Sequence, residues 1–244
     1  MPDRRAVARN RIPDHLHGKG PMPSSLRELY PNEFEVLTSL FGTTDVHAKL
    51  NRLDEIFQYT EQKWNAYVRL LPDQCVKYLL IAEAPPWIEV GPPQYLLDPG
   101  SRPRSLMKAI RSAFCLNRSA GDGSANLADL ACGGFLLVDS TPFSMDYSAA
   151  QRRSRKKYRD LIGLTAKTYL AEKLKTGSLS WSHELRIAFA VKLNAAPIID
   201  ALQFLDLGGR RFLLSPDMIA VNGAGYLDAP KLRACYALPA ARER

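Results

Sequence analysis

A chain of 244 residues in which 46% of the side chains are apolar is long enough to bury a substantial core, which excludes a chain disordered throughout. Its 33 Lys and Arg residues exceed its 25 Asp and Glu residues, and the resulting net charge of +8 favours polyanionic partners such as nucleic acid or an anionic surface. No apolar run approaches the ~20 residues that span a bilayer, so we expect no membrane segment and no membrane partner.

The first 24 residues combine arginines with prolines and glycines and contain no apolar stretch, so we expect a flexible basic arm at residues 1–24. A secretory signal needs a hydrophobic core after its basic residues, and none follows here. We therefore expect an intracellular, cytoplasmic protein. No linker rich in Gly, Ser or Pro divides the remaining sequence, and residues 25–244 are expected to form a single domain.

Helical periodicity begins directly after this arm. Ser24 or Ser25 is suited to cap a helix that Leu26 and Leu29 continue. Apolar residues then recur at helical spacing over residues 50–70. Two N-terminal helices are therefore predicted.

Four short apolar runs of strand length follow, each bounded by polar or turn-forming residues. Their near-continuous apolar character is typical of strands buried on both faces. The stretches between them have the pattern of helices. Alternating strands and helices predict an α/β fold, a three-layer α/β/α sandwich around a central, mainly parallel four-stranded sheet. The expected strands span residues 77–82, 134–139, 185–191 and 210–215, and the expected helices lie at residues 105–114, within 156–175 and at 195–207.

Polar residues stand at the ends of three of these runs, each followed closely by a proline. Glu83 and Asp139 end the first two runs, and Ser215 directly precedes Pro216 at the end of the fourth. Because ligands bind beyond the carboxyl ends of parallel strands, these positions are candidates for a functional site. The alternative is that acidic residues and prolines merely terminate the strands.

The order of these motifs resembles the uracil-DNA glycosylase superfamily. Ile-Ala-Glu-Ala-Pro-Pro at residues 81–86 is similar to the Gly-Glu-Ala-Pro-Gly motif of some branches, and Pro-Arg-Ser-Leu at 103–106 is similar to a helix start in that family. Gly-Phe-Leu-Leu-Val-Asp-Ser-Thr at 134–141 resembles a strand that ends in asparagine, and Leu-Ser-Pro-Asp at 214–217 takes the place of a His-Pro-Ser motif. The resemblance covers roughly residues 75–225, and it implies a divergent member that needs no metal or organic cofactor.

The resemblance carries functional roles onto four residues. It places Glu83 where a glutamate helps to orient or activate the attacking water, and Tyr95 where an aromatic ring stacks on the extruded base. Asp139 takes the position of the asparagine that reads the base. Ser215 takes that of the histidine that stabilises the departing base. Ala84 replaces the catalytic aspartate of another branch, so that route is absent.

Two of these replacements change the expected chemistry. Asparagine offers a donor and an acceptor, whereas an ionised Asp139 only accepts, and it suits a base that presents donors unless burial keeps the carboxyl protonated. Ser215 can donate one hydrogen bond but supplies no cation. The sequence is therefore compatible with a changed substrate, with slow turnover, or with binding that lacks catalysis.

A basic run follows the second strand end, with six cations among the nine residues 151–159. On the rim of the site it would contact DNA phosphates, and the alternative is a solvated helix face or a mobile loop. The Asn-Gly-Ala-Gly-Tyr segment at 222–226 is either a loop pressed into the duplex or a simple turn. The candidate DNA-binding residues are Arg152, Arg153, Arg155, Lys156, Lys157 and Asn222.

The four cysteines form no Cys-x-x-Cys pair, and no histidine lies at metal-ligand spacing from them. Neither a disulfide framework nor a structural zinc site is expected, and we assign no metal.

These features together predict a DNA-binding protein, acting on duplex or single-stranded DNA, that hydrolyses the N-glycosidic bond of a damaged or deaminated base in base-excision repair. A catalytically silent nucleic-acid-binding relative is the first alternative. An unrelated α/β enzyme that acts on a small anionic metabolite is the second. The pattern specifies neither the base nor the oligomeric state.

Overall fold

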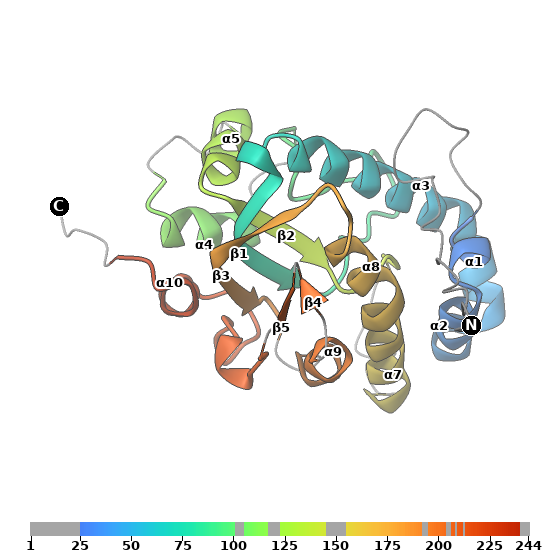
Figure 1. Cartoon of the computed structure of the whole chain (residues 1–244). Coiled ribbons are helices and arrows are strands. Elements are labelled where there is room, and N and C mark those ends of the chain that lie inside the picture. Colours follow the sequence, from blue (N-terminus) through green and yellow to red (C-terminus); the bar gives the residue numbers. More distant parts are fainter. Residues whose placement is uncertain are drawn as a thin grey trace, which may run out of the picture.

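The computed structural model describes residues 25–100, 105–116, 123–144, 155–191, 195–203, 206–207, 209–211 and 213–239; the predicted N-terminal arm lies outside these ranges. The fold is α/β, with a parallel three-stranded sheet between helices (Figure 1). The strands are β1 (Cys75–Ala82), β2 (Phe135–Asp139) and β3 (Ser180–Phe189), in the order β2-β1-β3.

The sheet confirms the parallel pairing that the apolar runs predict. Every residue of β2 is buried, and its register with β1 runs from Tyr78 opposite Phe135 to Ala82 opposite Asp139. The carboxyl ends of these two strands therefore lie side by side at one edge of the sheet. The pairing of β1 with β3 shifts register between Val76 and Tyr78, so β3 begins five residues earlier than the apolar run at 185–191 indicated.

The prediction of a fourth strand at residues 210–215 is wrong for the described part of the chain. Arg210–Arg211 (β5) pairs antiparallel with Asp206–Leu207 (β4), apart from the central sheet. Pro216 has no N–H to donate to a ladder and begins a short 3₁₀ turn, Pro216–Met218 (η4). The place beside β3 is taken by Ile219, which forms a single parallel bridge with Phe189.

From residue 25 to the first strand, the structure has three α-helices rather than the predicted two: α1 (Leu26–Leu29), α2 (Pro31–Phe41) and α3 (Thr43–Val68). Gly42, at φ +91°, separates α2 from α3. Ser25 occupies the N-cap position of α1, but its side chain makes no capping bond; the N–H of Leu26 donates instead to Asp54 Oδ1 of α3, at 2.7 Å. No helix in the described ranges is both long and apolar enough to cross a bilayer.

Helix α3 covers the free edge of β2 through side chains. The indole N–H of Trp64 donates to the carbonyl of Leu137 at 3.1 Å, and the Tyr67 hydroxyl donates to that of Phe135 at 2.9 Å. Both side chains are buried. These bonds satisfy edge carbonyls that would otherwise be free to pair with another strand.

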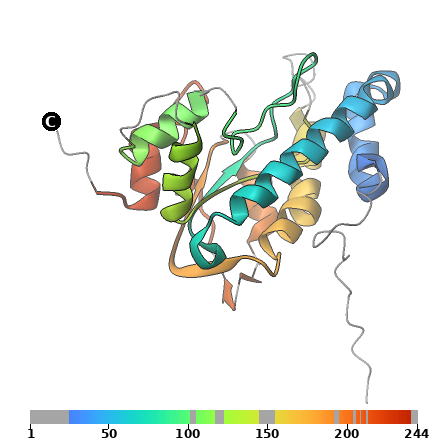
Figure 2. The ribbon, with the colours of Figure 1, turned by 90° about the horizontal axis from the view of Figure 1, so that it is seen from above.

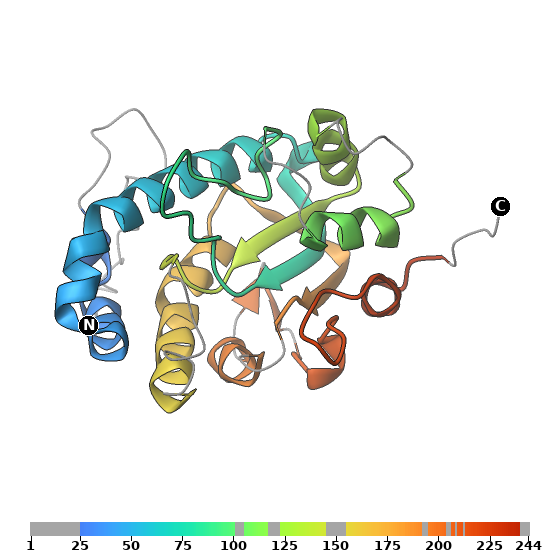
Figure 3. The ribbon, with the colours of Figure 1, turned by 180° about the vertical axis from the view of Figure 1, so that it is seen from behind.

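The remaining helices lie on two sides of the sheet. Figures 2 and 3 show α4, α5 and α10 on one side and α7 and α8 on the other. On the first side, the rings of Phe114 and Tyr236 pack against Tyr78, and Phe114 also contacts Phe135. The bounds of these elements are η2 (Pro72–Gln74), α4 (Ser105–Ala113), α5 (Gly123–Cys132), α7 (Arg155–Thr165), η3 (Ala166–Leu170), α8 (Ala171–Leu174), α9 (Ala195–Leu202) and α10 (Ala229–Tyr236).

Candidate active site

The structure brings Glu83 and the end of β2 together. The carbonyl of Glu83 accepts hydrogen bonds from the hydroxyl of Ser140, at 2.8 Å, and from the N–H of Thr141, at 3.2 Å. Because Asp139 directly precedes these residues and pairs with Ala82, two acidic residues stand on neighbouring strand ends. This is the edge of the sheet at which the sequence predicted a site.

The Glu83 side chain is half-buried and is held from α7. Its carboxylate accepts a hydrogen bond from the hydroxyl of Tyr158, a residue that is itself only 6% exposed. Helix α7 thus fixes the side chain of Glu83, while the chain after β2 fixes its backbone. The result is a carboxylate with a defined orientation that is still partly open to solvent.

Asp139 is enclosed more deeply, with 3% of its surface exposed, and it accepts a hydrogen bond from the hydroxyl of Tyr95. Burial raises the pKa of Asp139 to about 7, against the opposing effects of the Lys173 charge and the Tyr95 hydrogen bond; Glu61 adds to the increase. Burial, with the Asp139 charge, also raises the pKa of Tyr95, which therefore stays a donor. Asp139 changes its charge near neutral pH.

An ion pair between the buried Lys173 and the partly buried Glu61 lies close enough to act on Asp139. Lys173 Nζ is 2.7 Å from Glu61 Oε1 and donates to the Tyr169 hydroxyl at 2.9 Å, while that hydroxyl donates to Glu61, also at 2.9 Å. The ammonium also lies over the Trp64 ring, 4.3 Å from its centroid. Removing Glu61 would leave the buried Lys173 charge without its carboxylate partner, and losing one partner of a fully buried pair typically costs about 3–5 kcal/mol.

The helix that carries Tyr169 and Lys173 has an unusual segment. Residues 155–174 run through α7, η3 and α8, and η3 (Ala166–Leu170) has π-helical hydrogen bonding. Tyr169 lies in this segment, and Lys173 follows it by four residues. Such π segments change which side chains a helix aims at its neighbours, and they are frequent at functional sites.

Sequence reasoning missed Glu61, Tyr158, Tyr169 and Lys173. The only local signal is the spacing of Tyr169 and Lys173, which places both on one face of a helix. The other contacts are distant in sequence: Tyr158 meets Glu83 across 75 residues, and Tyr169 meets Glu61 across 108.

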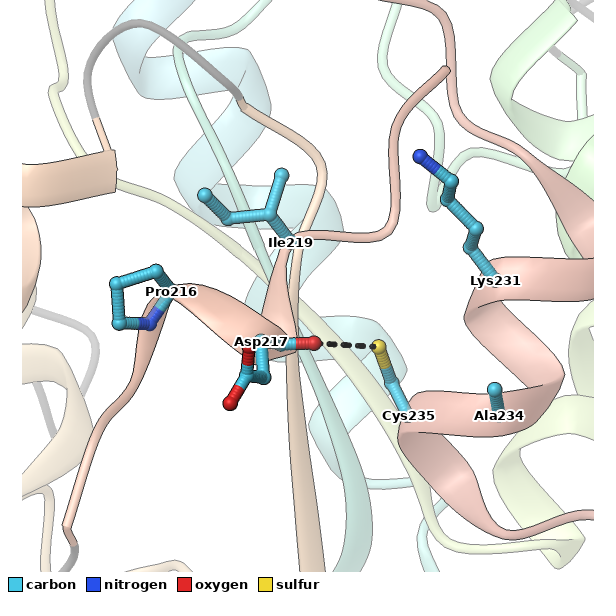
Figure 4. A pocket seen from close by; sticks show the side chains of 6 residues that line it. All are labelled: Pro216, Asp217, Ile219, Lys231, Ala234 and Cys235. Carbon is cyan, nitrogen blue, oxygen red and sulfur yellow. Dashed lines mark hydrogen bonds between the residues drawn. The ribbon is translucent and has the colours of Figure 1, made fainter.

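Ser215 is not joined to this cluster by any described contact. It caps η4, accepting from the N–H of Asp217 at 3.1 Å, and its hydroxyl is 3.3 Å from Asp217 Oδ2. The adjoining cavity, of about 390 Å³ between η4 and α10, is lined by Pro216, Asp217, Ile219, Lys231, Ala234 and Cys235 (Figure 4). Neither Glu83 nor Asp139 lines it.

Two interactions show how this second cavity is held. The Cys235 thiol donates to the carbonyl of Asp217, with Sγ 3.8 Å from the oxygen, and Lys231 Nζ donates to the carbonyl of Val221 at 2.8 Å. Burial raises the pKa of the Cys235 thiol, so the neutral form is favoured. All four cysteines are free thiols. The described residues contain no cluster of three or more His, Cys, Asp or Glu suited to a metal ion.

Asn222 holds a tight turn just beyond the bridge that Ile219 makes to β3. Its Oδ1 accepts from the N–H groups of Ala224, at 3.0 Å, and Tyr226, at 3.1 Å. The amide oxygen is thus used within the turn. Tyr226, a large apolar side chain in this turn, is 64% exposed to solvent.

The structure describes part of the basic run. Arg152 and Arg153 lie outside the described residues, and Arg155 is the first residue of α7. The side chain of Lys156 is 91% exposed and 3.2 Å from Asp160, and Lys157 donates to the carbonyl of Ser39 at the end of α2, at 3.1 Å. Lys156 and Lys157 thus lie on the outer side of the helix whose inner side carries Tyr158.

Comparisons with known proteins returned no significant match to any family model, curated protein or solved structure.

Proposed function

We propose that this protein binds DNA and hydrolyses the N-glycosidic bond of a damaged or deaminated base. The observation that supports this best is the pair of acidic residues on the ends of β1 and β2, Glu83 and Asp139, in different environments. Two carboxyl groups whose surroundings differ in this way are suited to opposite roles in acid–base chemistry. A glycosylase needs one group that positions water and another that holds the base.

In the proposed reaction, the partly exposed carboxylate of Glu83 orients a water molecule toward the anomeric carbon of the sugar. Water adds to this carbon, the bond to the base nitrogen breaks, and its electron pair leaves with the base. The water gives a proton to Glu83, the departing base anion takes a proton from solvent, and Glu83 then returns its proton to solvent. The products are a free base and an abasic sugar.

Asp139 is assigned to base recognition. With a pKa of about 7, its neutral form is well populated at physiological pH and presents one O–H donor and one carbonyl acceptor. That set is similar to the donor and acceptor of an asparagine amide, so a uracil-type edge belongs among the substrates to be tested. Tyr95 orients this carboxyl through its hydroxyl and offers its ring to the base in the proposed complex.

Binding without catalysis is the second candidate, and one observation favours it. Tyr95 and Asp139 are only 2% and 3% exposed and are bonded to each other, so a base reaches them only if the covering segments move. Ser215 also supplies no cation for the departing base, and its hydroxyl is bonded to Asp217.

The deciding experiment incubates the protein with duplex and single-stranded oligonucleotides that carry uracil, hypoxanthine or xanthine, and measures the abasic sites formed. We expect base release, and a Glu83→Gln variant should lower its rate by about 10²-fold or more, because general-base catalysis contributes that much. Glu172→Gln is the matched control, since Glu172 is an exposed glutamate on α8.

Three outcomes would contradict the proposed function or the role of Glu83 in it. Release at an undiminished rate by Glu83→Gln would remove Glu83 from the mechanism. Salt-dependent DNA binding with no release would favour the binding protein. Absence of both binding and release would favour an enzyme that acts on a small anionic metabolite.

A further inference from the structure

Glu83 is held from two directions by parts of the chain that lie far apart in sequence. Its carbonyl is bound by Ser140 and Thr141 after β2, and its carboxylate is bound by the hydroxyl of Tyr158 on α7, 75 residues along the chain. The backbone contacts fix where the residue stands. They do not fix the three side-chain torsions, and the hydrogen bond from Tyr158 constrains the orientation of the carboxylate.

Tyr158 is firmly anchored in the fold. It is 6% exposed, and Leu161 and Ile162, on the next turn of α7, are completely buried. Helix α7 itself packs against α2 and α9. Because its ring is packed into the core, the Tyr158 hydroxyl has a fixed position. A residue that positions another side chain needs such a fixed position.

We propose that Tyr158 is a positioning residue that holds the Glu83 carboxylate in the orientation used in the hydrolysis described above. This inference rests on the proposed function. Glu83 Oε1 accepts the hydrogen bond from the Tyr158 hydroxyl. The exposed Lys156 and the neighbouring Lys157 precede Tyr158 on the same helix, so DNA phosphates bound to this surface would meet the element that orients Glu83.

The kinetic test compares Tyr158→Phe with Tyr67→Phe under single-turnover conditions. Both changes remove one hydroxyl from a buried ring, but Tyr67 donates to the carbonyl of Phe135, which is not part of the site. We expect Tyr158→Phe to slow base release about tenfold to a hundredfold, since small misplacements of reacting groups cost that much, with the Kd for DNA changed less than about twofold. Tyr67→Phe should leave the rate nearly unchanged.

Combination with Glu83→Gln separates positioning from a general structural effect. If Tyr158 acts only through the Glu83 carboxylate, the double variant Tyr158→Phe/Glu83→Gln should be no slower than Glu83→Gln alone. Multiplying losses would overturn the inference, as would an unchanged rate in Tyr158→Phe alone.

A second measurement needs no activity and distinguishes failure of this inference from failure of the proposed function. We expect the changes in urea midpoint to be non-additive for Tyr158→Phe, Glu83→Ala and their double variant. The reason is that the two single changes remove the same hydrogen bond. The midpoints of Tyr67→Phe, Glu83→Ala and their double variant should add. If no oligonucleotide releases a base, the proposed function fails, but non-additive midpoints in the first set still support the inference that Tyr158 positions Glu83. If the midpoints add in both sets, that inference is overturned.

Discussion

At the scale of single residues, the environment of Asp139 determines what this carboxyl group can do. It is almost fully buried, and the Tyr95 hydroxyl donates to it. Desolvation raises its pKa more than the Lys173 charge and the Tyr95 bond lower it. The folded protein therefore holds a proton on Asp139 over a pH range in which the unfolded chain has lost it.

Asp139→Asn should flatten the dependence of stability on pH between about pH 4 and pH 7. In this window the folded state binds one more proton than the unfolded state, so the free energy of unfolding of the wild type falls as pH rises. The shift in the pKa of Asp139 from 3.8 to about 7 corresponds to a stabilisation of about 4 kcal/mol at most. This stabilisation is fully present below pH 4 and is lost by about pH 7. Urea unfolding at several pH values measures the difference.

The control for this prediction is Asp160→Asn, which changes an exposed carboxyl on α7. It should retain the wild-type pH dependence. A slope in Asp139→Asn equal to that of the wild type would show that Asp139 does not carry the extra proton.

At the scale of elements, the entry into β2 depends on one glycine. Gly134 has φ +73°, and its carbonyl accepts from the N–H groups of Lys77, at 2.8 Å, and Tyr78, at 3.0 Å. A Cβ on this residue would lie 3.0 Å from Lys77 Cβ and 3.1 Å from Lys77 N. The turn thus brings β2 so close to β1 that only glycine fits, and this approach sets the register that places Asp139 beside Ala82.

Gly134→Ala should lower the free energy of unfolding by about 2–4 kcal/mol, because it adds the cost of positive φ to that of a steric clash against backbone. Gly133→Ala is the neighbouring control. Gly133 does not have positive φ, and the nearest atom to an added Cβ is 3.4 Å away, so the change should stay within about 0.5 kcal/mol. Equal denaturation midpoints for the two variants would contradict this account of the turn.

At the scale of the whole molecule, the charge of +8 and the position of α7 suggest where a polyanion would bind. Lys156 and Lys157 lie at the start of this helix, and Tyr158 beside them contacts the carboxyl edge of the sheet. By contrast, Lys77 lies near the opposite, amino end of β1, and Lys175 follows the end of α8. Cations therefore stand both near the proposed site and away from it.

Replacing Lys156 and Lys157 with Ala should weaken DNA binding and make its salt dependence shallower by about 1–2 in the slope of log K against log salt, since each phosphate contact contributes about 0.9. The Lys77→Ala/Lys175→Ala variant has the same net charge and should keep the wild-type slope. Fluorescence anisotropy across a salt series measures both. Equal slopes for the two variants would remove the start of α7 from the DNA interface.

The sequence by itself determined the parallel β1, β2 and β3 and the neighbouring positions of Glu83 and Asp139. Apolar runs report burial locally, and parallel strands must end at the same edge, so these predictions need no knowledge of the packing. The same local pattern gave a wrong prediction at residues 210–215. This apolar run is less buried than the three that form the sheet, and Pro216 begins a turn before the chain reaches β3.

Only the tertiary structure decided what surrounds those two acidic residues. Tyr158 meets Glu83 across 75 residues, and Tyr169 meets Glu61 across 108. Ser215, which the motif order placed with them, pairs with Asp217 instead. Hydrophobic periodicity indicates which face of an element is buried, but the partner of a polar side chain depends on how the helices pack and, for Tyr169, on the π segment that carries it.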